Sequence, residues 1–259
     1  MKVSIITAVL NNQEHIAGCI NSVRSQTYKD IEHIIVDSGS VDATREVLKS
    51  YVNSSIKVIY EEKQGVYCAL NKGISEASGN IIGILHSDDL YADEYAVERV
   101  VNILKNSEVD GAYGDLLYVR RDQPDKVIRY WRSGEFKLSK LKFGWLPPHP
   151  TLFLKKEAYQ SIGLFDTSFS IASDYDFMLR LLLSKRFNLC YIKEVLIKMR
   201  MGGLSNKSLG SILKKSHEDF LILRRHQMGF AVFTLLAKNF SKLPQFIKVA
   251  IQQKTKAYD

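Results

Sequence analysis

The sequence is poor in cysteine and has no long apolar run. Its three cysteines, Cys19, Cys68 and Cys190, lie far apart and form no CxxC pair. An odd number of dispersed thiols predicts free cysteines in a reducing compartment and no zinc site. The longest largely apolar run of the C-terminal region, residues 230–237, is eight residues long, whereas a membrane-spanning helix needs about 20. No signal peptide precedes the first strand-like segment, so we expect a cytoplasmic protein, soluble or peripheral.

Two glycine-rich phosphate-binding motifs are also missing. The first predicted strand is not followed by GxGxxG, and GxxxxGK[ST] does not occur in the sequence. Dinucleotide oxidoreductases and P-loop enzymes use these motifs to cradle phosphates, so both classes are disfavoured. If the protein binds phosphates, we expect a divalent metal ion to neutralise them.

Most of the net positive charge lies in one region. The net charge is +8, but residues 205–259 hold ten Lys or Arg against three Asp or Glu. Because the first four-fifths of the chain is almost neutral, a nucleic-acid-binding surface spread over the whole domain is not expected. Basic residues beside bulky apolar ones around residues 230–248 are typical of a helix that lies on anionic lipid. The alternative is a helix that packs on the domain with its charges in solvent.

Strand and helix signals alternate over the first hundred residues. Apolar runs at residues 3–9, 31–36, 56–60 and 80–86 predict strands, and apolar stripes at helical spacing lie between them. Alternation of this kind predicts a mainly parallel sheet with helices on both faces. Beyond residue 110 the pattern loosens. Further strands are expected at 111–119, 126–131, 187–192 and 195–200, a shaped loop at 144–150, and helices near 155–162, 174–185, 207–228 and 230–253.

Acidic residues follow three of the predicted strands. Asp37 comes after the second, Glu61 and Glu62 after the third, and Asp88 and Asp89 after the fourth. Ligands of open α/β sheets bind at this carboxyl edge. A single carboxylate there can accept N–H groups of a nucleobase, and adjacent carboxylates can hold a hard divalent cation. Both groups could instead be turn residues or helix caps.

A series of motifs in a fixed order carries a resemblance to a known family. The motifs are VSIITAVLNN (residues 3–12), SVRSQTY (22–28), IIVDSGSVDAT (34–44), GVY (65–67), NKGI (71–74), ASG (77–79), HSDD (86–89), PHPT (148–151), GLFD (163–166), SDYDFMLR (173–180) and GGLS (202–205). Together they resemble family 2 glycosyltransferases, including bacterial enzymes that build surface polysaccharides.

The resemblance implies a Rossmann-like GT-A fold and a sugar transfer. The expected domain spans residues 1–206, with a nucleotide-sugar half (1–109) and an acceptor half (110–206), and a basic amphipathic helical tail follows (207–259). The implied reaction moves a sugar, with inversion, from a nucleoside-diphosphate donor to a hydroxyl of a glycan or lipid-linked acceptor. The donor would be a UDP-sugar rather than a GDP-sugar, and the tail would hold the enzyme on the cytoplasmic face of an anionic membrane.

The resemblance also assigns roles to individual residues. Asp89 would hold Mn²⁺ or Mg²⁺ against the diphosphate, and Asp174, at the start of a helix, would be the general base. On the acceptor side lie His149, Asp176 and Arg180. The residues expected around the nucleotide sugar are Thr7, Ala8, Asn11, Glu14, Asp37, Gly65 and Asp88, with Asp37 reading the base and Asp88 near the ribose or the donor sugar.

The sequence departs from the family pattern at two positions. Leu10 stands where Tyr is common, and Ser173 replaces the Glu of the usual Glu-Asp pair, which leaves Asp176 as an alternative to Asp174. Arg180 follows Asp176 at i+4, the spacing of a helical ion pair.

Two other functions remain open from the sequence. A sugar-phosphate nucleotidylyltransferase uses a similar sheet, but it would need a glycine-rich basic loop after the first strand. Residues 7–14 contain no Gly, Lys or Arg. The second alternative is a non-catalytic protein that binds nucleotides or carbohydrates.

Overall fold

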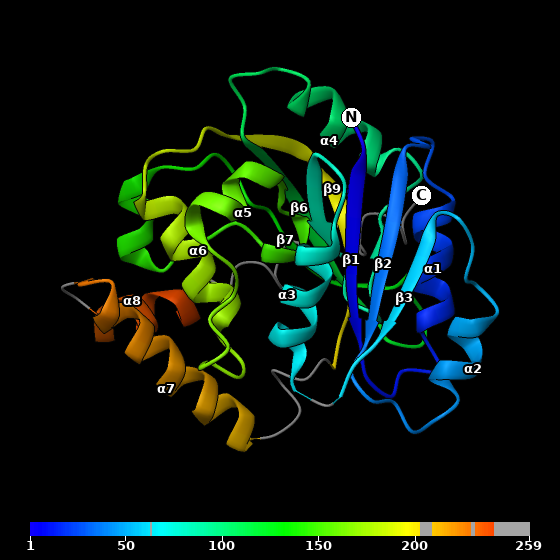
Figure 1. Ribbon diagram of the computed structural model, residues 1–259. Helices are drawn as coiled ribbons and strands as arrows, with labels where there is room; N and C mark the ends of the chain where they lie inside the picture. The colour runs from blue at the N-terminus through cyan, green and yellow to red at the C-terminus, as the bar shows by residue number, and fades with distance from the viewer. Residues whose placement is uncertain (63, 203–208, 229–230, 241–259) are drawn as a thin grey trace, which may run out of the picture.

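The computed structural model describes residues 1–62, 64–202, 209–228 and 231–240, and Figure 1 labels their elements. The strands are β1 (Val3–Val9), β2 (Ile31–Asp37), β3 (Ile56–Tyr60), β4 (Ile81–Ile84), β5 (Leu90–Tyr91), β6 (Gly111–Val119), β7 (Val127–Trp131), β8 (Phe153–Lys155) and β9 (Leu189–Arg200). The helices are α1 (Ile16–Arg24), α2 (Thr44–Lys49), α3 (Val66–Glu76), α4 (Ala96–Leu104), α5 (Lys156–Ile162), α6 (Ser173–Leu183), α7 (Leu209–Arg225) and α8 (Ala231–Phe240), with 3-10 turns η1 (Leu138–Phe143) and η2 (His149–Thr151).

All the strands join one mixed, mostly parallel sheet. Its order is β3-β2-β1-β4-β8-β6-β9-β5, and β7 pairs with β6. β1 to β4 run parallel, as do β6 and β9. β8 runs antiparallel to both β4 and β6 and so joins the two halves of the sheet. The predicted α/β fold class is confirmed.

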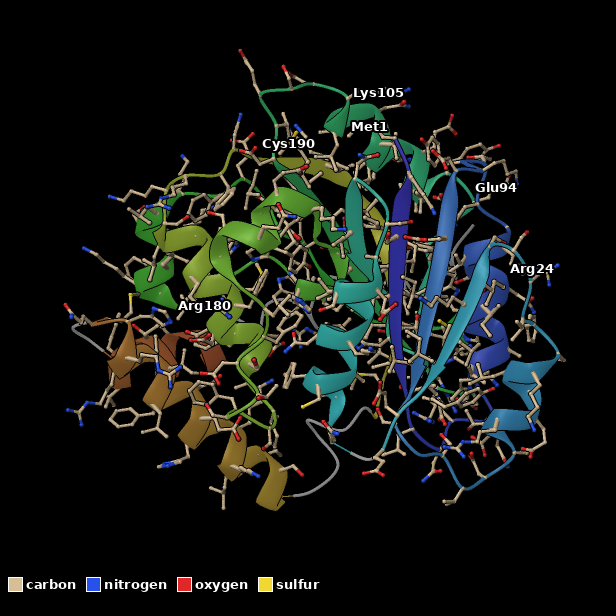
Figure 2. The ribbon with its side chains drawn as sticks, viewed as in Figure 1. Met1, Arg24, Glu94, Lys105, Arg180 and Cys190 are labelled. Atoms are coloured by element: carbon tan, nitrogen blue, oxygen red, sulfur yellow. The ribbon has the colours of Figure 1, made fainter. Side chains whose placement is uncertain are left out.

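Helices cover both faces of the sheet. Apolar residues of α3, α5 and α6 pack on one face, and those of α1, α2 and α4 pack on the other (Figure 1). Every residue of β1 is buried. A strand covered on both faces reads as a continuous apolar run, which explains the sequence signal. Figure 2 shows the side chains filling the space between the sheet and the helices, with Arg24 of α1 and Arg180 of α6 toward opposite sides of the view.

The structure confirms most predicted elements and corrects others. The strands expected at residues 187–192 and 195–200 are one strand, β9, because it pairs with β6 along its whole length despite shifts of register around Asp115. Of the helical stripes expected between the first strands, the one between β2 and β3 forms only the short helix α2 (Thr44–Lys49). The shaped loop at 144–150 contains the turn η2. β5 and β8 were not predicted, since runs of two and three residues carry no periodicity.

The described part of the C-terminal tail packs on the domain. Ile222 and Leu223 of α7 have no exposed surface and belong to the same apolar core as α6. The hydroxyl of Thr234 in α8 donates to the carbonyl oxygen of Lys142 at 2.9 Å. The alternative of a packed tail therefore holds for these segments. Among the described residues, no helix combines the length and the apolar character that crossing a membrane requires.

Some expectations fall outside the described residues. They are the end of the GGLS motif, the domain boundary at 206/207, and the tail beyond residue 240.

Candidate functional site

The loops that follow β1, β2 and β4 are tied together at the carboxyl edge of the sheet. Asn11, in the left-handed region with φ 49°, accepts a hydrogen bond from the backbone N–H of Val41 at 2.8 Å. Its own N–H donates to the Ser40 hydroxyl at 2.9 Å. The Asn12 amide group donates to the hydroxyl of Ser87 at 2.9 Å. These contacts bring Asp37 and the Asp88–Asp89 pair to one edge.

Asp37 ends β2 and is fully buried. Its carboxylate accepts the Arg45 guanidinium N–H at 2.7 Å and the backbone N–H of Ser40 at 3.2 and 3.3 Å. The turn contact that the sequence allowed is therefore present. The predicted contact with a nucleobase stays a prediction.

Asp89 has a buried carboxylate, and only one of its two oxygens accepts a hydrogen bond within the described residues. Its side chain is 1% exposed, and Oδ1 accepts the backbone N–H of Arg200 at 3.0 Å. Oδ2 is buried and has no hydrogen-bond partner in the described part of the chain. Burial and the neighbouring Asp88 raise the pKa of Asp89 well above its usual range. A buried oxygen without a donor needs a hydrogen-bonding or cationic partner.

Two arginines surround this acidic pair. Arg200 donates to the carbonyl oxygens of Asp88 and Arg121, and the Arg121 guanidinium lies 3.5 Å from the Asp88 carboxylate. Burial and the charges of these two arginines lower the pKa of His15. Neither arginine was among the site residues predicted from the sequence. The only signal for Arg200 was a basic residue at a predicted strand end, just before the GGLS motif.

The other residues predicted for the nucleotide pocket differ in their environment. Thr7 and Ala8 lie within β1, not in a loop. The buried Thr7 hydroxyl donates to the carbonyl oxygen of Leu85 at 2.8 Å. Glu14 is largely exposed. Gly65 precedes α3 with φ 96°, a conformation that favours glycine. No observation tests their predicted roles.

Asp174 is the second residue of α6 and meets Tyr67 from α3. The Tyr67 hydroxyl lies 2.7 Å from the carbonyl oxygen of Ile171 and 3.2 Å from Oδ1 of Asp174. The same Oδ1 accepts the backbone N–H of Tyr175 at 2.9 Å. Tyr67 belongs to the GVY motif, yet the sequence reading gave it no role. α6 thus brings Asp174 into contact with α3.

Burial also shifts the pKa of two other side chains, His149 and Tyr118. His149 is 8% exposed, its ring meets the edge of Phe165 with centroids 5.4 Å apart, and burial lowers its pKa to about 4. It is therefore neutral at physiological pH. Burial raises the pKa of Tyr118, and the charges of both Asp89 and Asp174 add to that shift.

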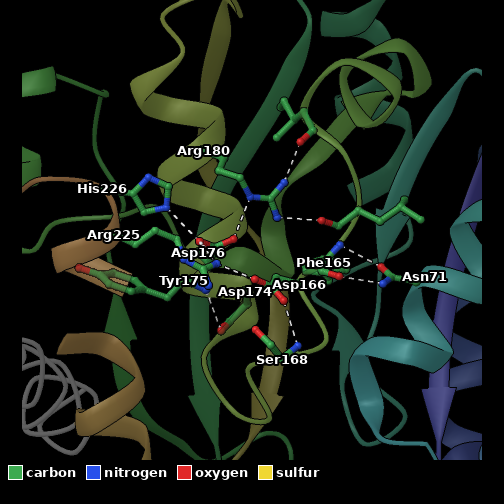
Figure 3. A network of polar contacts seen from close by, with 12 residues as sticks. Asn71, Phe165, Asp166, Ser168, Asp174, Tyr175, Asp176, Arg180, Arg225 and His226 are labelled. Atoms are coloured by element: carbon green, nitrogen blue, oxygen red, sulfur yellow. Dashed lines mark hydrogen bonds and ion pairs between the residues drawn. The ribbon is translucent and has the colours of Figure 1, made fainter. Parts of the chain in front are cut away.

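Asp176 faces a different group of residues (Figure 3). Its carboxylate is 1% exposed and accepts Nε of Arg180 at 2.8 Å, so the predicted i+4 pair is confirmed. The other oxygen lies 2.9 Å from Nε2 of His226, just beyond α7. Arg180 also donates to the carbonyl oxygens of Ile162 and Leu164. This network joins α6 to the tail. The predicted acceptor-side roles of Asp176 and Arg180 stay predictions.

Residues 4–172 match the family described as glycosyl transferase family 2. The chain belongs to this family. It is 32% identical over 206 residues to an uncharacterized glycosyltransferase of Rickettsia typhi, with 77% of this chain and 64% of that protein covered. It is 27% identical over 208 residues to the PGL/p-HBAD biosynthesis glycosyltransferase of Mycobacterium tuberculosis, with 78% of each covered. The chain spans somewhat less than two thirds of the R. typhi protein and 54% of a similar glycosyltransferase of Nostoc.

Solved structures of two glycosyltransferases share the fold. TarS residues 1–349 from S. aureus, in complex with UDP-GlcNAc, match with a TM-score of 0.67 at 16% identity, covering 96% of this chain and 79% of that one. The mannosyltransferase PcManGT from Pyrobaculum calidifontis, in complex with GDP-Man and Mn²⁺, matches with a TM-score of 0.63 at 16% identity, covering 98% and 75%. The expected GT-A fold is confirmed.

Replacing Asp176 with Asn tests the network between α6 and the tail. Burial raises the pKa of this carboxyl, but His226 and Arg180 outweigh it and hold the pKa below its usual value. We expect Asp176→Asn to lower the free energy of unfolding by roughly 2–3 kcal/mol at neutral pH, because Arg180 and His226 lose the buried carboxylate that they contact. A folded-state pKa below the unfolded value of about 3.9 means that this stabilisation is complete above that pH and is lost as the pH falls further.

Urea denaturation between pH 3 and pH 7 measures both effects. The difference between wild type and Asp176→Asn should be constant from about pH 5 upward and shrink below pH 4. A difference that stays constant down to pH 3 would contradict the ion-pair assignment.

Proposed function

We propose that the protein transfers a sugar from a nucleoside-diphosphate donor to an acceptor hydroxyl with inversion, and that Asp174 is the base. The observation that carries the proposal is the pair formed by Asp89, with its unpartnered buried oxygen, and Asp174, anchored by Tyr67. A donor-side carboxylate at the carboxyl edge of the sheet and an acceptor-side carboxylate held beside Tyr67 fit a transfer between two bound substrates.

A divalent metal ion fits this donor side. Asp89 Oδ2 supplies a single hard oxygen ligand, and within the described ranges no cluster of three or more His, Cys, Asp or Glu could hold an ion alone. Mg²⁺ and Mn²⁺ sites commonly combine one or two carboxylates with substrate phosphates. When bound, the ion would stabilise the charge of the departing diphosphate. Arg121 and Arg200 would add positive charge on the same side.

The proposed reaction is a single displacement at the anomeric carbon, in which Asp174 takes the proton of the acceptor. The acceptor oxygen attacks the anomeric carbon while the bond from that carbon to the phosphate oxygen breaks. The nucleoside diphosphate leaves with the electron pair, and the acceptor proton passes to Asp174. A single in-line displacement inverts the anomeric centre. Asp176 is poorly suited to this task because Arg180 and His226 already occupy both of its oxygens.

The donor is proposed to be a UDP-sugar, with Asp37 accepting a uracil N–H. TarS was solved with UDP-GlcNAc and PcManGT with GDP-Man, so both nucleotides need to be compared. The acceptor is proposed to be a glycan or lipid-linked saccharide of a bacterial surface polysaccharide. Membership of glycosyl transferase family 2 supports sugar transfer over the nucleotidylyltransferase alternative, and a transfer assay would separate an enzyme from a non-catalytic binding protein.

Asp174→Asn tests the base. The variant keeps the shape of the side chain but cannot take a proton, so turnover should fall by roughly 10²–10⁴ while donor affinity stays within a few-fold. The measurement is donor turnover beside nucleotide binding by calorimetry. Asp176→Asn is the matched control, and it should lose stability rather than turnover. The reverse pattern would identify Asp176 as the base.

Asp89→Asn tests the metal ligand. Because the amide is a weaker ligand than a carboxylate, Mn²⁺ should no longer raise the melting temperature of the protein in the presence of UDP. The same melting temperatures are measured with GDP in place of UDP and in samples without metal. An unchanged Mn²⁺-dependent shift in the variant would exclude Asp89 as the ligand.

Because a lipid-linked acceptor lies in a membrane, we also propose that the protein binds a membrane surface. Phe143 of η1 and Phe233 of α8 are 57% and 52% exposed, and their rings meet edge to face with centroids 6.0 Å apart. The exposed Lys137 and Lys142 lie in and beside η1. Exposed aromatic rings next to lysines suit an anionic bilayer. η1 was not part of the predicted lipid-binding segment, and it extends the proposed surface from the tail onto the acceptor half.

Replacing Phe143 and Phe233 together with Ser tests this surface. Binding to liposomes should rise with anionic lipid content and fall with salt, because the attraction fades over about 8 Å at physiological ionic strength. The double variant should also lose the part of the binding that salt does not remove. Val52→Ser, at an exposed apolar residue of the nucleotide half, is the control in co-sedimentation. Equal binding to neutral and anionic liposomes would refute the proposed surface.

A further inference from the structure

A buried carboxylate of the C-terminal helix holds the backbone that precedes α6. Glu218 of α7 is 7% exposed. Its Oε2 accepts the backbone N–H groups of Ile171 and Ala172, both at 2.9 Å. Its Oε1 accepts the N–H of Ser170 at 3.1 Å and the hydroxyl of that residue at 2.8 Å. Both oxygens are therefore used, and three successive backbone donors that precede a helix are satisfied by one side chain.

The peptide at Ile171 is held from two sides. Its N–H donates to Glu218 of the tail, and its carbonyl oxygen accepts the Tyr67 hydroxyl of the nucleotide half at 2.7 Å. Asp174 comes three residues later and lies 3.2 Å from the same hydroxyl. The position of the Asp174 carboxylate therefore depends on a segment that two distant parts of the chain fix in place.

The charge of Glu218 suits this position. Burial raises the pKa of this carboxyl, but its hydrogen bonds from residues 170–172 outweigh burial and lower the pKa. The group is therefore ionised at neutral pH. A negative charge is also stabilised close to the N-terminus of a helix, here α6.

From this geometry we infer that Glu218 is a positioning residue for Asp174. It acts by fixing residues 170–172, and it does not itself touch substrate. The inference rests on the proposed role of Asp174 as the base. Glu218 lies beyond the residues that match the family, which end at 172, so this function belongs to the tail of this chain.

A second set of contacts keeps α7 in place. His226 lies against Asp176, and Arg225 forms an ion pair with Asp166, as Figure 3 shows. Ile222 and Leu223 of the same helix are fully buried. α7 can therefore stay docked when the Glu218 contacts are removed, and a single substitution can test the positioning role. Cutting the chain near Ser211, by contrast, would remove all these contacts together.

The test compares Glu218→Ala and Glu218→Gln with Thr234→Val. The control removes a buried hydrogen bond of the tail, to Lys142, and does not touch residues 170–172. A displacement of the base by about 1 Å can cost as much as roughly 10²-fold in rate. We expect Glu218→Ala to lower kcat by about 10–100-fold with the KM for the donor within two-fold. The kcat of Glu218→Gln, which keeps one acceptor oxygen, should lie between the kcat of Glu218→Ala and that of wild type. Thr234→Val should keep wild-type kcat.

Hydrogen–deuterium exchange of the full-length variants gives a readout that does not depend on activity. The amides of residues 170–172 should exchange faster in Glu218→Ala and stay protected in Thr234→Val. Unchanged protection of these amides in Glu218→Ala, or faster exchange with wild-type kcat, would overturn the inference. Failure of the proposed function has a different signature, in which Asp174→Asn keeps wild-type turnover while the exchange result for Glu218→Ala still stands.

Discussion

The close approach of β8 to β4 is the constraint on which the rest of the structure depends. The Phe153 ring lies over Gly83, where a Cβ atom would come within 2.3 Å of it. Only a residue without a side chain leaves room for this contact. The antiparallel pairing then continues from β8 to β6. In this way the parallel part of the sheet, β1 to β4, and the mixed part that contains β6 and β9 share one continuous sheet and one buried core on each face.

This junction assembles the site from residues far apart in the sequence. Once β6 is placed beside β8, β9 pairs parallel to β6 and ends at Arg200. The backbone N–H of Arg200 meets Asp89, which is 111 positions earlier in the chain. On the face covered by α3, Tyr67 reaches the start of α6. Asp89 and Asp174 are thereby each brought into contact with residues from distant parts of the chain.

The buried carboxylates of the described residues differ in how their charge is satisfied. Arg45 and a turn amide satisfy Asp37, and Arg180 and His226 satisfy Asp176. Backbone N–H groups and a hydroxyl satisfy Glu218. Asp89 keeps one oxygen without a partner. Because burying an unpaired charge is costly, these contacts stabilise the three paired carboxylates, and the unpartnered oxygen of Asp89 fits a ligand-binding role.

The sequence by itself determined the alternation of strands and helices, the acids at strand ends and the family, because periodicity and motif order are local properties of the chain. It also indicated Asp174 as a base, but it could not distinguish Asp174 from Asp176, since both acids lie on the same helical turn. Only the tertiary structure distinguished them, because Tyr67 lies beside Asp174 and His226 lies beside Asp176. It alone revealed Arg200 and Glu218, because their partners lie 111 and 46–48 positions away. Contacts over such separations leave no periodic signal, and they form only when the sheet and the helices pack.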